Sequence, residues 1–149
     1  MATPFSTIED LALVTIQDYK LDRMYRASPT NWETFVAGYV VRASLHFDNS
    51  NIDLSYDLIN KQFINTLGNS EIQILVYLFI QMWIERVAQN LTQIVSTMTP
   101  SDAKRTNVPA MVKEQQYKLD TLREKTAQMI TEYSYANADF QGWANGNFF

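Results

Sequence analysis

The hydrophobic residues of this chain recur mostly three or four positions apart, which is the period of an amphipathic helix. The first such run, Ile8, Leu11, Ala12 and Ile16, follows a serine and a glutamate with the spacing of a capping box, Ser6-Thr7-Ile8-Glu9. This pattern predicts a helix that ends near Asp18. Residues 18–28 are mixed and polar, and their apolar anchors are Tyr19, Leu21, Met24 and Tyr25.

A second helix is predicted from Pro29 to about Leu45. Ser28 and Pro29 have the order of an N-cap followed by proline at the first helical position. Thr30 to Glu33 is an alternative capping box one step later. The apolar residues that follow at helical spacing are Trp32, Phe35, Val36, Tyr39, Val40 and Ala43.

Residues 46–69 follow a different period. After a polar loop at 46–51, apolar and polar residues alternate from Ile52 to Leu58, as in a half-buried strand. Asn60-Lys61 can form a turn that leads to a return strand at 63–67, although this pair suits a tight turn less well than Asn-Gly. We therefore expect a short β-hairpin within residues 52–67.

Two longer helices are predicted in the second half of the chain. The helix from Ser70 to about Val95 is apolar almost all round its middle, so it must be covered on several sides. In a chain of this size, that places it at the centre of a bundle, at a subunit interface, or at both. The helix that begins near Pro109 has a coiled-coil-like seam, which we expect to pack against the helix from Ser70 within the same chain. The seam residues are Val112, Gln115, Leu119, Leu122, Thr126, Met129 and Tyr133.

These elements together predict a mainly α fold. We expect a bundle of about four helices in residues 1–135, with the hairpin as an insertion at 52–67 and an extended C-terminal arm at 136–149. The length of 149 residues fits one domain, and a hydrophobic content of 46% can supply its core. The longest apolar run, at 72–84, is shorter than the roughly 20 residues that span a bilayer, so we interpret it as a buried helix.

Composition and candidate chemistry argue against an enzyme. The net charge of −4 disfavours a surface that binds nucleic-acid phosphates, and the lack of cysteine excludes thiolate zinc sites, disulfides and cysteine nucleophiles. The single histidine, His46, has no evident catalytic partner. The acids Glu9-Asp10 and Asp18 with Asp22 stand near helix ends, where carboxylates usually complement the helix dipole. We therefore predict no catalytic residue, no metal and no cofactor.

The C-terminal segment carries the strongest functional signal. Four large aromatics stand among small and polar residues without a periodic pattern: Phe140, Trp143, Phe148 and Phe149. Such a segment cannot bury these rings by itself, and exposed apolar surface costs roughly 25 cal/mol per Å². Either the segment folds back over its own bundle, or its aromatics are partner-binding residues that lie in a groove of another subunit.

Scattered patches within residues 8–135 resemble one family of structural proteins. They are Ile16-Gln17-Asp18-Tyr19-Lys20-Leu21-Asp22, Ser55-Tyr56-Asp57-Leu58, Trp83-Ile84-Glu85-Arg86, Asn90-Leu91-Thr92-Gln93 and Thr121-Leu122-Arg123-Glu124-Lys125. In them the chain resembles the head-to-tail connector (adaptor, or head-completion) proteins of tailed bacteriophages of Gram-positive bacteria. The resemblance implies a helical bundle, made in the host cytoplasm, that forms a homo-oligomeric dodecameric ring beneath the portal protein in the virion neck. The C-terminal arm would reach the portal, the ring would carry the next neck or tail protein, and DNA would pass through without specific binding. No membrane is implied.

Two other classes of function stay open at this point. A cytosolic phage assembly chaperone or regulator would use the same apolar surfaces transiently. A small enzyme with an atypical site would depend on His46. A stable ring in virions indicates the connector, whereas a monomer or dimer that is absent from particles indicates the chaperone.

Overall fold

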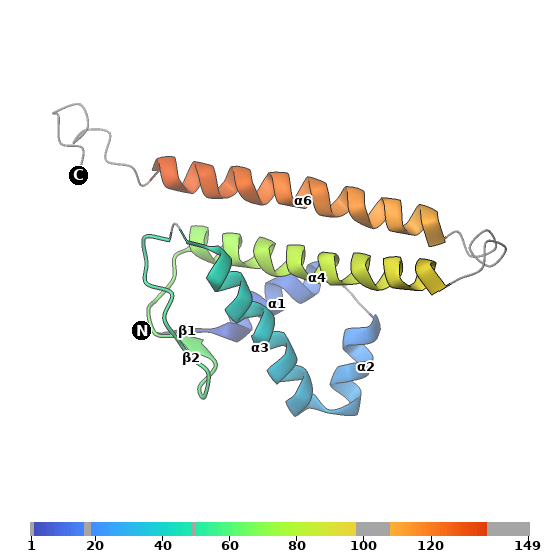
Figure 1. Cartoon of the computed structure of the whole chain (residues 1–149). Coiled ribbons are helices and arrows are strands. Elements are labelled where there is room, and N and C mark those ends of the chain that lie inside the picture. Colours follow the sequence, from blue (N-terminus) through green and yellow to red (C-terminus); the bar gives the residue numbers. More distant parts are fainter. Residues whose placement is uncertain (1, 17–18, 49, 98–107, 137–149) are drawn as a thin grey trace.

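The computed structural model describes residues 2–16, 19–48, 50–97 and 108–136, and it confirms a mainly helical bundle with a small β insertion (Figure 1). The helices of the described part are α1 (Phe5–Ile16), α2 (Tyr19–Ala27), α3 (Pro29–His46), α4 (Asn69–Thr97) and α6 (Val108–Ala136). The strands are β1 (Thr3–Pro4), β2 (Tyr56–Asp57) and β3 (Gln62–Phe63).

Helix α4 is the central helix of the bundle. Helix α6 runs antiparallel along one side of it, and α1 and α3 lie on the other side (Figure 1). Phe79 and Trp83 of α4 are buried, and so are the seam residues Leu119, Thr126 and Tyr133 of α6. The predicted packing of these two long helices within one chain is therefore confirmed, and the cover on both sides explains why α4 is apolar almost all round.

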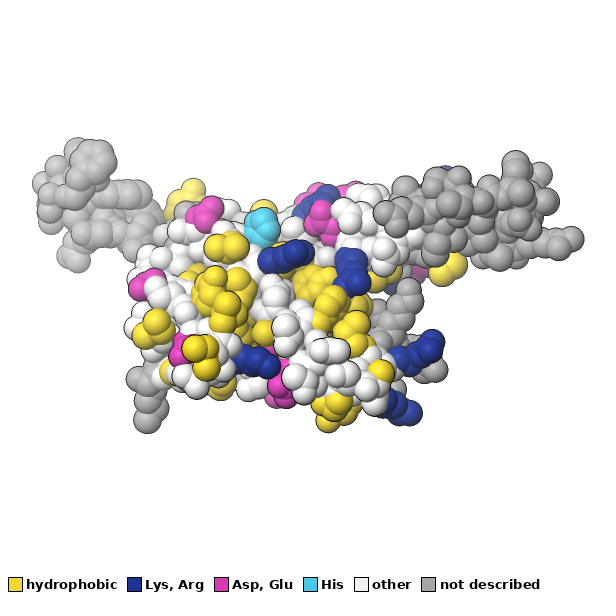
Figure 2. Space-filling view, turned by 60° about the horizontal axis from the view of Figure 1, so that its bottom comes forward, with side chains coloured by type: hydrophobic (Ala, Val, Ile, Leu, Met, Phe, Trp, Pro, Cys, Tyr) yellow, Lys and Arg dark blue, Asp and Glu magenta, His cyan; other side chains and the backbone are white. Residues whose placement is uncertain are grey.

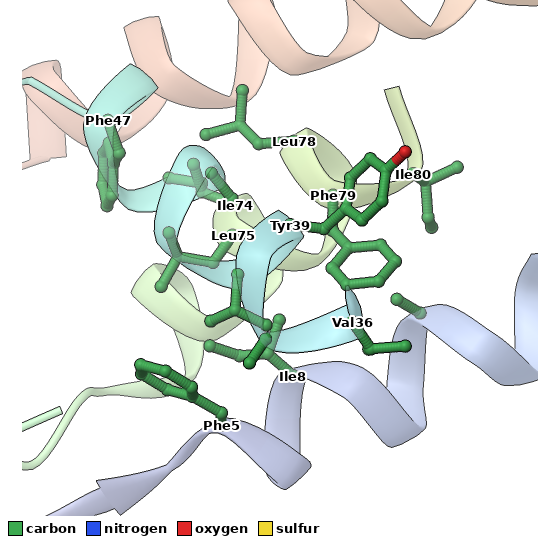
Figure 3. Close-up of a cluster of buried hydrophobic side chains, with 14 of the residues drawn as sticks. Phe5, Ile8, Val36, Tyr39, Phe47, Ile74, Leu75, Leu78, Phe79 and Ile80 are labelled. Atoms are coloured by element: carbon green, nitrogen blue, oxygen red, sulfur yellow. The ribbon is translucent and has the colours of Figure 1, made fainter. Parts of the chain in front are cut away.

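The hydrophobic core lies where α1, α3 and α4 meet. Phe5, Ile8, Val36, Leu75 and Phe79 are almost completely buried there (Figure 3). Each fully buried side chain of this size stabilises the fold by roughly 1.5–3 kcal/mol. The buried face of α1 runs through residues 5, 8, 9 and 12, so residue 11, predicted on the same face, is 51% exposed instead.

The predicted hairpin is confirmed within residues 52–67. Strands β2 and β3 pair antiparallel, with Tyr56 opposite Phe63, and Lys61 in the turn has a left-handed φ of 52°. Strand β1 pairs with the other edge of β3, and the backbone N–H of Phe5 donates to the carbonyl of Lys61 at 2.9 Å. This third strand was not predicted, because two residues before a helix carry no periodic signal.

Helix boundaries follow the predicted caps in part. Ser28 is the N-cap of α3, and its Oγ accepts from the backbone N–H of Asn31 at 3.5 Å. Helix α1 begins at Phe5, so Ser6 lies inside the helix and the predicted cap there is wrong. Residues 19–27 form a helix that was not predicted, and His46 ends α3 rather than lying in a loop.

Candidate functional site

The predicted partner-binding aromatics Phe140, Trp143, Phe148 and Phe149 lie in residues 137–149, outside the described part of the chain. Their role stays a prediction. The described residues add two surface features, an apolar hairpin tip and a groove between α3 and α4.

The tip of the β2–β3 hairpin presents large aliphatic side chains to solvent. Leu58 and Ile59, in the turn between β2 and β3, are 58% and 92% exposed. The turn that carries them is ordered by Asp57, whose Oδ1 accepts from the backbone N–H of Ile59 at 2.9 Å and whose Oδ2 accepts from the Asn60 side chain at 2.7 Å. The side-chain hydrogen bond from Asn60, followed by those from the backbone, lowers the pKa of Asp57. These hydrogen bonds hold the turn in one conformation, and its apolar side chains project into solvent.

Beneath the hairpin, a buried carboxyl group corrects one prediction. Glu9 was expected to complement the helix dipole, but α1 begins at Phe5, so Glu9 lies in a later turn and is only 8% exposed. Burial is the main cause that raises its pKa to about 7, and the charges of Asp10 and Glu33 add to it, whereas Lys61 opposes it. The Lys61 Nζ lies 3.0 Å from Glu33 Oε2 and ties the hairpin to α3.

A groove of about 480 Å³ separates one face of α3 from one face of α4. Its walls are built by residues at helical spacing on each side, namely Tyr39, Arg42 and His46 of α3 and Met82, Glu85, Arg86 and Gln89 of α4. Figure 2 shows this face, with the histidine in cyan beside dark-blue basic side chains and with yellow apolar surface on both sides.

The guanidinium group of Arg86 is held in a defined position in this groove. Its Nη1 donates to the hydroxyl of Tyr39 at 3.2 Å, and its Cζ lies 4.7 Å from the centroid of the Phe35 ring. The adjacent carboxylate of Glu85 pairs instead with Arg123 of α6, at 3.6 Å. Within the described residues, no carboxylate forms an ion pair with Arg42 or Arg86, so both positive charges are available to a ligand.

A second hollow, of about 350 Å³, lies between the start of α4 and the end of α6. Two of its polar side chains, Tyr133 and Glu71, are bonded to each other. The hydroxyl of Tyr133 donates to Glu71 Oε1 at 2.9 Å and accepts from the backbone N–H of Asn51 at 2.9 Å. This network joins α4, α6 and the loop after α3, and we interpret it as structural.

The described residues hold no group of three or more His, Cys, Asp or Glu side chains that could bind a metal ion. None of the described helices has the length and hydrophobicity needed to cross a membrane. The groove escaped sequence reasoning because its walls come from two helices whose mutual orientation no local pattern encodes. For the hairpin tip a signal did exist, since Leu58 and Ile59 directly precede the predicted turn at Asn60-Lys61.

Comparison with known proteins identifies no relative. The chain matches no protein-family model, no curated protein and no solved structure. The described geometry and the sequence patterns are therefore the basis for the function proposed below.

Proposed function

We propose that this protein is a non-enzymatic structural subunit that works by binding other proteins. The observation that carries this proposal is the hairpin tip, where Leu58 and Ile59 project from an ordered turn. Single exposed apolar residues are common, but two large adjacent ones at the end of an ordered hairpin are typical of a protein contact. The conformational entropy lost on binding is small, because the turn is already ordered.

The particular role that we propose is that of a head-to-tail connector in the neck of a tailed bacteriophage. The scattered resemblance to that family supports it, together with two separate contact elements, the hairpin and the aromatic C-terminal arm. A subunit that contacts its neighbour through two different surfaces can close into a ring. The ring would join the portal to the next neck or tail protein. The net charge of −4 would help DNA to pass without being held.

Large aromatic residues supply most of the energy in many interfaces, so Phe140, Trp143, Phe148 and Phe149 are the proposed anchors of the arm. A segment that orders on binding gives up entropy and needs several anchors at once. The alternative, a cytosolic phage assembly chaperone, would use the same surfaces transiently and would be absent from finished particles.

The test combines mass spectrometry of purified virions with deletion of residues 137–149 in a phage that carries this gene. We expect the protein in virions. We expect the deletion to leave helical circular dichroism and melting nearly unchanged, because residues from Phe5 to Tyr133 already form a continuous buried core. The same deletion should abolish incorporation and leave full heads without tails.

A matched pair at the hairpin tip separates its role from that of the arm. Ile59→Asp should reduce incorporation, whereas Ile59→Val, which keeps an apolar tip, should not. Absence of the protein from virions would favour the chaperone. Unfolding of the truncated protein would mean that the arm covers its own bundle. Normal assembly by the truncated protein would exclude the arm as the binding element and leave the hairpin tip.

A further inference from the structure

The groove between α3 and α4 has the chemistry of a site for a negatively charged group. Arg42 and Arg86 face the same space, and no described carboxylate pairs with either of them. Arg86 is pre-positioned by the Tyr39 hydroxyl and the Phe35 ring, so little entropy is lost when it binds. A guanidinium group binds carboxylates and phosphates through charge-assisted hydrogen bonds.

A carboxylate of a protein fits this groove better than a nucleic-acid backbone. Binding to DNA phosphates requires many clustered cations, whereas the groove has two arginines and also contains Glu85. Tyr39 and Met82 add apolar contact area beside the charges, as in the wall of a protein interface.

The chain itself contains a segment that matches the groove. Residues 137–149 have a single charged side chain, Asp139, and it directly precedes the proposed anchor Phe140. We propose that the groove binds Asp139-Phe140 of a neighbouring copy, with the carboxylate of Asp139 between Arg42 and Arg86. This inference rests on the proposed function, because it assigns one contact of the ring.

The distance from the end of α6 to Arg86 favours a neighbouring copy over the same copy, because a carboxylate that contacts both arginines must reach Arg86. Asp139 follows Ala136 by three residues, which extend at most about 10 Å. Arg123 of α6 pairs with Glu85, the neighbour of Arg86, and so marks the level of Arg86 along the bundle. From Arg123 to Ala136, α6 advances about 20 Å, and this is the distance that the arm would have to return to reach Arg86 of its own chain. The Arg86 side chain is directed to Tyr39 and Phe35, so it cannot extend along the bundle to close this gap.

The test is a charge exchange in the full-length protein. Self-association is measured by sedimentation velocity and native mass spectrometry over a range of concentrations. The variants are Arg42→Glu, Asp139→Arg and the two combined. Arg23→Glu on α2 is the matched control, because Arg23 is exposed and lies outside the groove. Thermal melting of each variant checks that the fold is intact.

We expect each single exchange to weaken self-association by about 10- to 100-fold, the range for a charged hydrogen-bonded pair. The combined variant should recover most of the loss, and Arg23→Glu should behave like the wild type. A mixture of the two single variants should also associate, because the intact arm of one can bind the intact groove of the other.

Each contrary result has a distinct meaning. A wild-type chain that self-associates but is insensitive to both exchanges would overturn the groove assignment and leave the ring proposal standing. A wild-type chain that stays monomeric at all concentrations would overturn the ring proposal as well. Single losses without recovery in the mixture would overturn binding between copies. An effect of Arg42→Glu on duplex DNA binding alone would assign the groove to phosphate and overturn the proposal.

Discussion

Replacing the buried Glu9 by glutamine should stabilise the protein at neutral and alkaline pH but not at acid pH. Glu9 is 8% exposed, and its carboxylate forms no hydrogen bond with another described residue. Burial without donors disfavours the charged form, which raises the pKa of this group from its ordinary value of 4.5 to about 7. Glutamine has nearly the same shape and no charge to desolvate.

The size and the sign of the effect follow from this pKa. Below pH 4.5, Glu9 is protonated in both the folded and the unfolded chain, so its burial does not reduce the free energy of unfolding. Between pH 4.5 and about 7 the unfolded chain ionises first, and stability is lost as the pH rises through the folded pKa. At about 1.4 kcal/mol for each unit of pKa, the upper limit is roughly 3 kcal/mol. Solvent still reaches part of the carboxyl group, so we expect about 1–2 kcal/mol.

The assay is urea unfolding followed by circular dichroism at pH 4.5, 6 and 8. The free energy of unfolding of Glu9→Gln should equal that of the wild type at pH 4.5 and exceed it by the expected amount at pH 8. Glu124→Gln on the exposed face of α6 is the control and should show no such pH dependence. If the difference between Glu9→Gln and the wild type is the same at all three pH values, the assigned pKa is wrong.

Three further predictions test the central helix, the buried network and the charge argument. Trp83→Ala should lower the free energy of unfolding by about 3–5 kcal/mol, and an unchanged melting temperature would contradict the central position of α4. Tyr133→Phe removes the hydroxyl that bridges Glu71 and the loop after α3, and should cost about 1–3 kcal/mol in urea unfolding. Tyr117→Phe, at a position 73% exposed, should cost almost nothing. The isolated protein should not shift duplex DNA in a gel at physiological salt, whereas micromolar, salt-sensitive binding would contradict the argument from its charge and implicate residues 104–105.

Local patterns in the sequence were sufficient to locate the three long helices α3, α4 and α6. Each has several turns, so its apolar residues repeat often enough to define a period, and Ser28 marks the start of α3. Alternation of apolar and polar residues before the turn at Lys61 located the hairpin. Strand β1 was missed because two residues are too few to establish a period. In α2, Leu21, Met24 and Tyr25 do stand three and four positions apart, but the polar residues around them were interpreted as a connecting segment.

Only the tertiary structure decided which residues are buried and which residues of different helices lie side by side. Glu9 has the same sequence neighbours whether it is solvated or buried, and it is the packing of α1 that desolvates it and raises its pKa. Arg42 and Arg86 are far apart in the chain, and only the crossing of α3 and α4 brings them to one groove. Composition alone marked the aromatic arm, because the number and type of its side chains do not depend on where they pack. Burial and charge pairing, by contrast, are properties of surfaces in contact, and the order of residues along one element does not specify them.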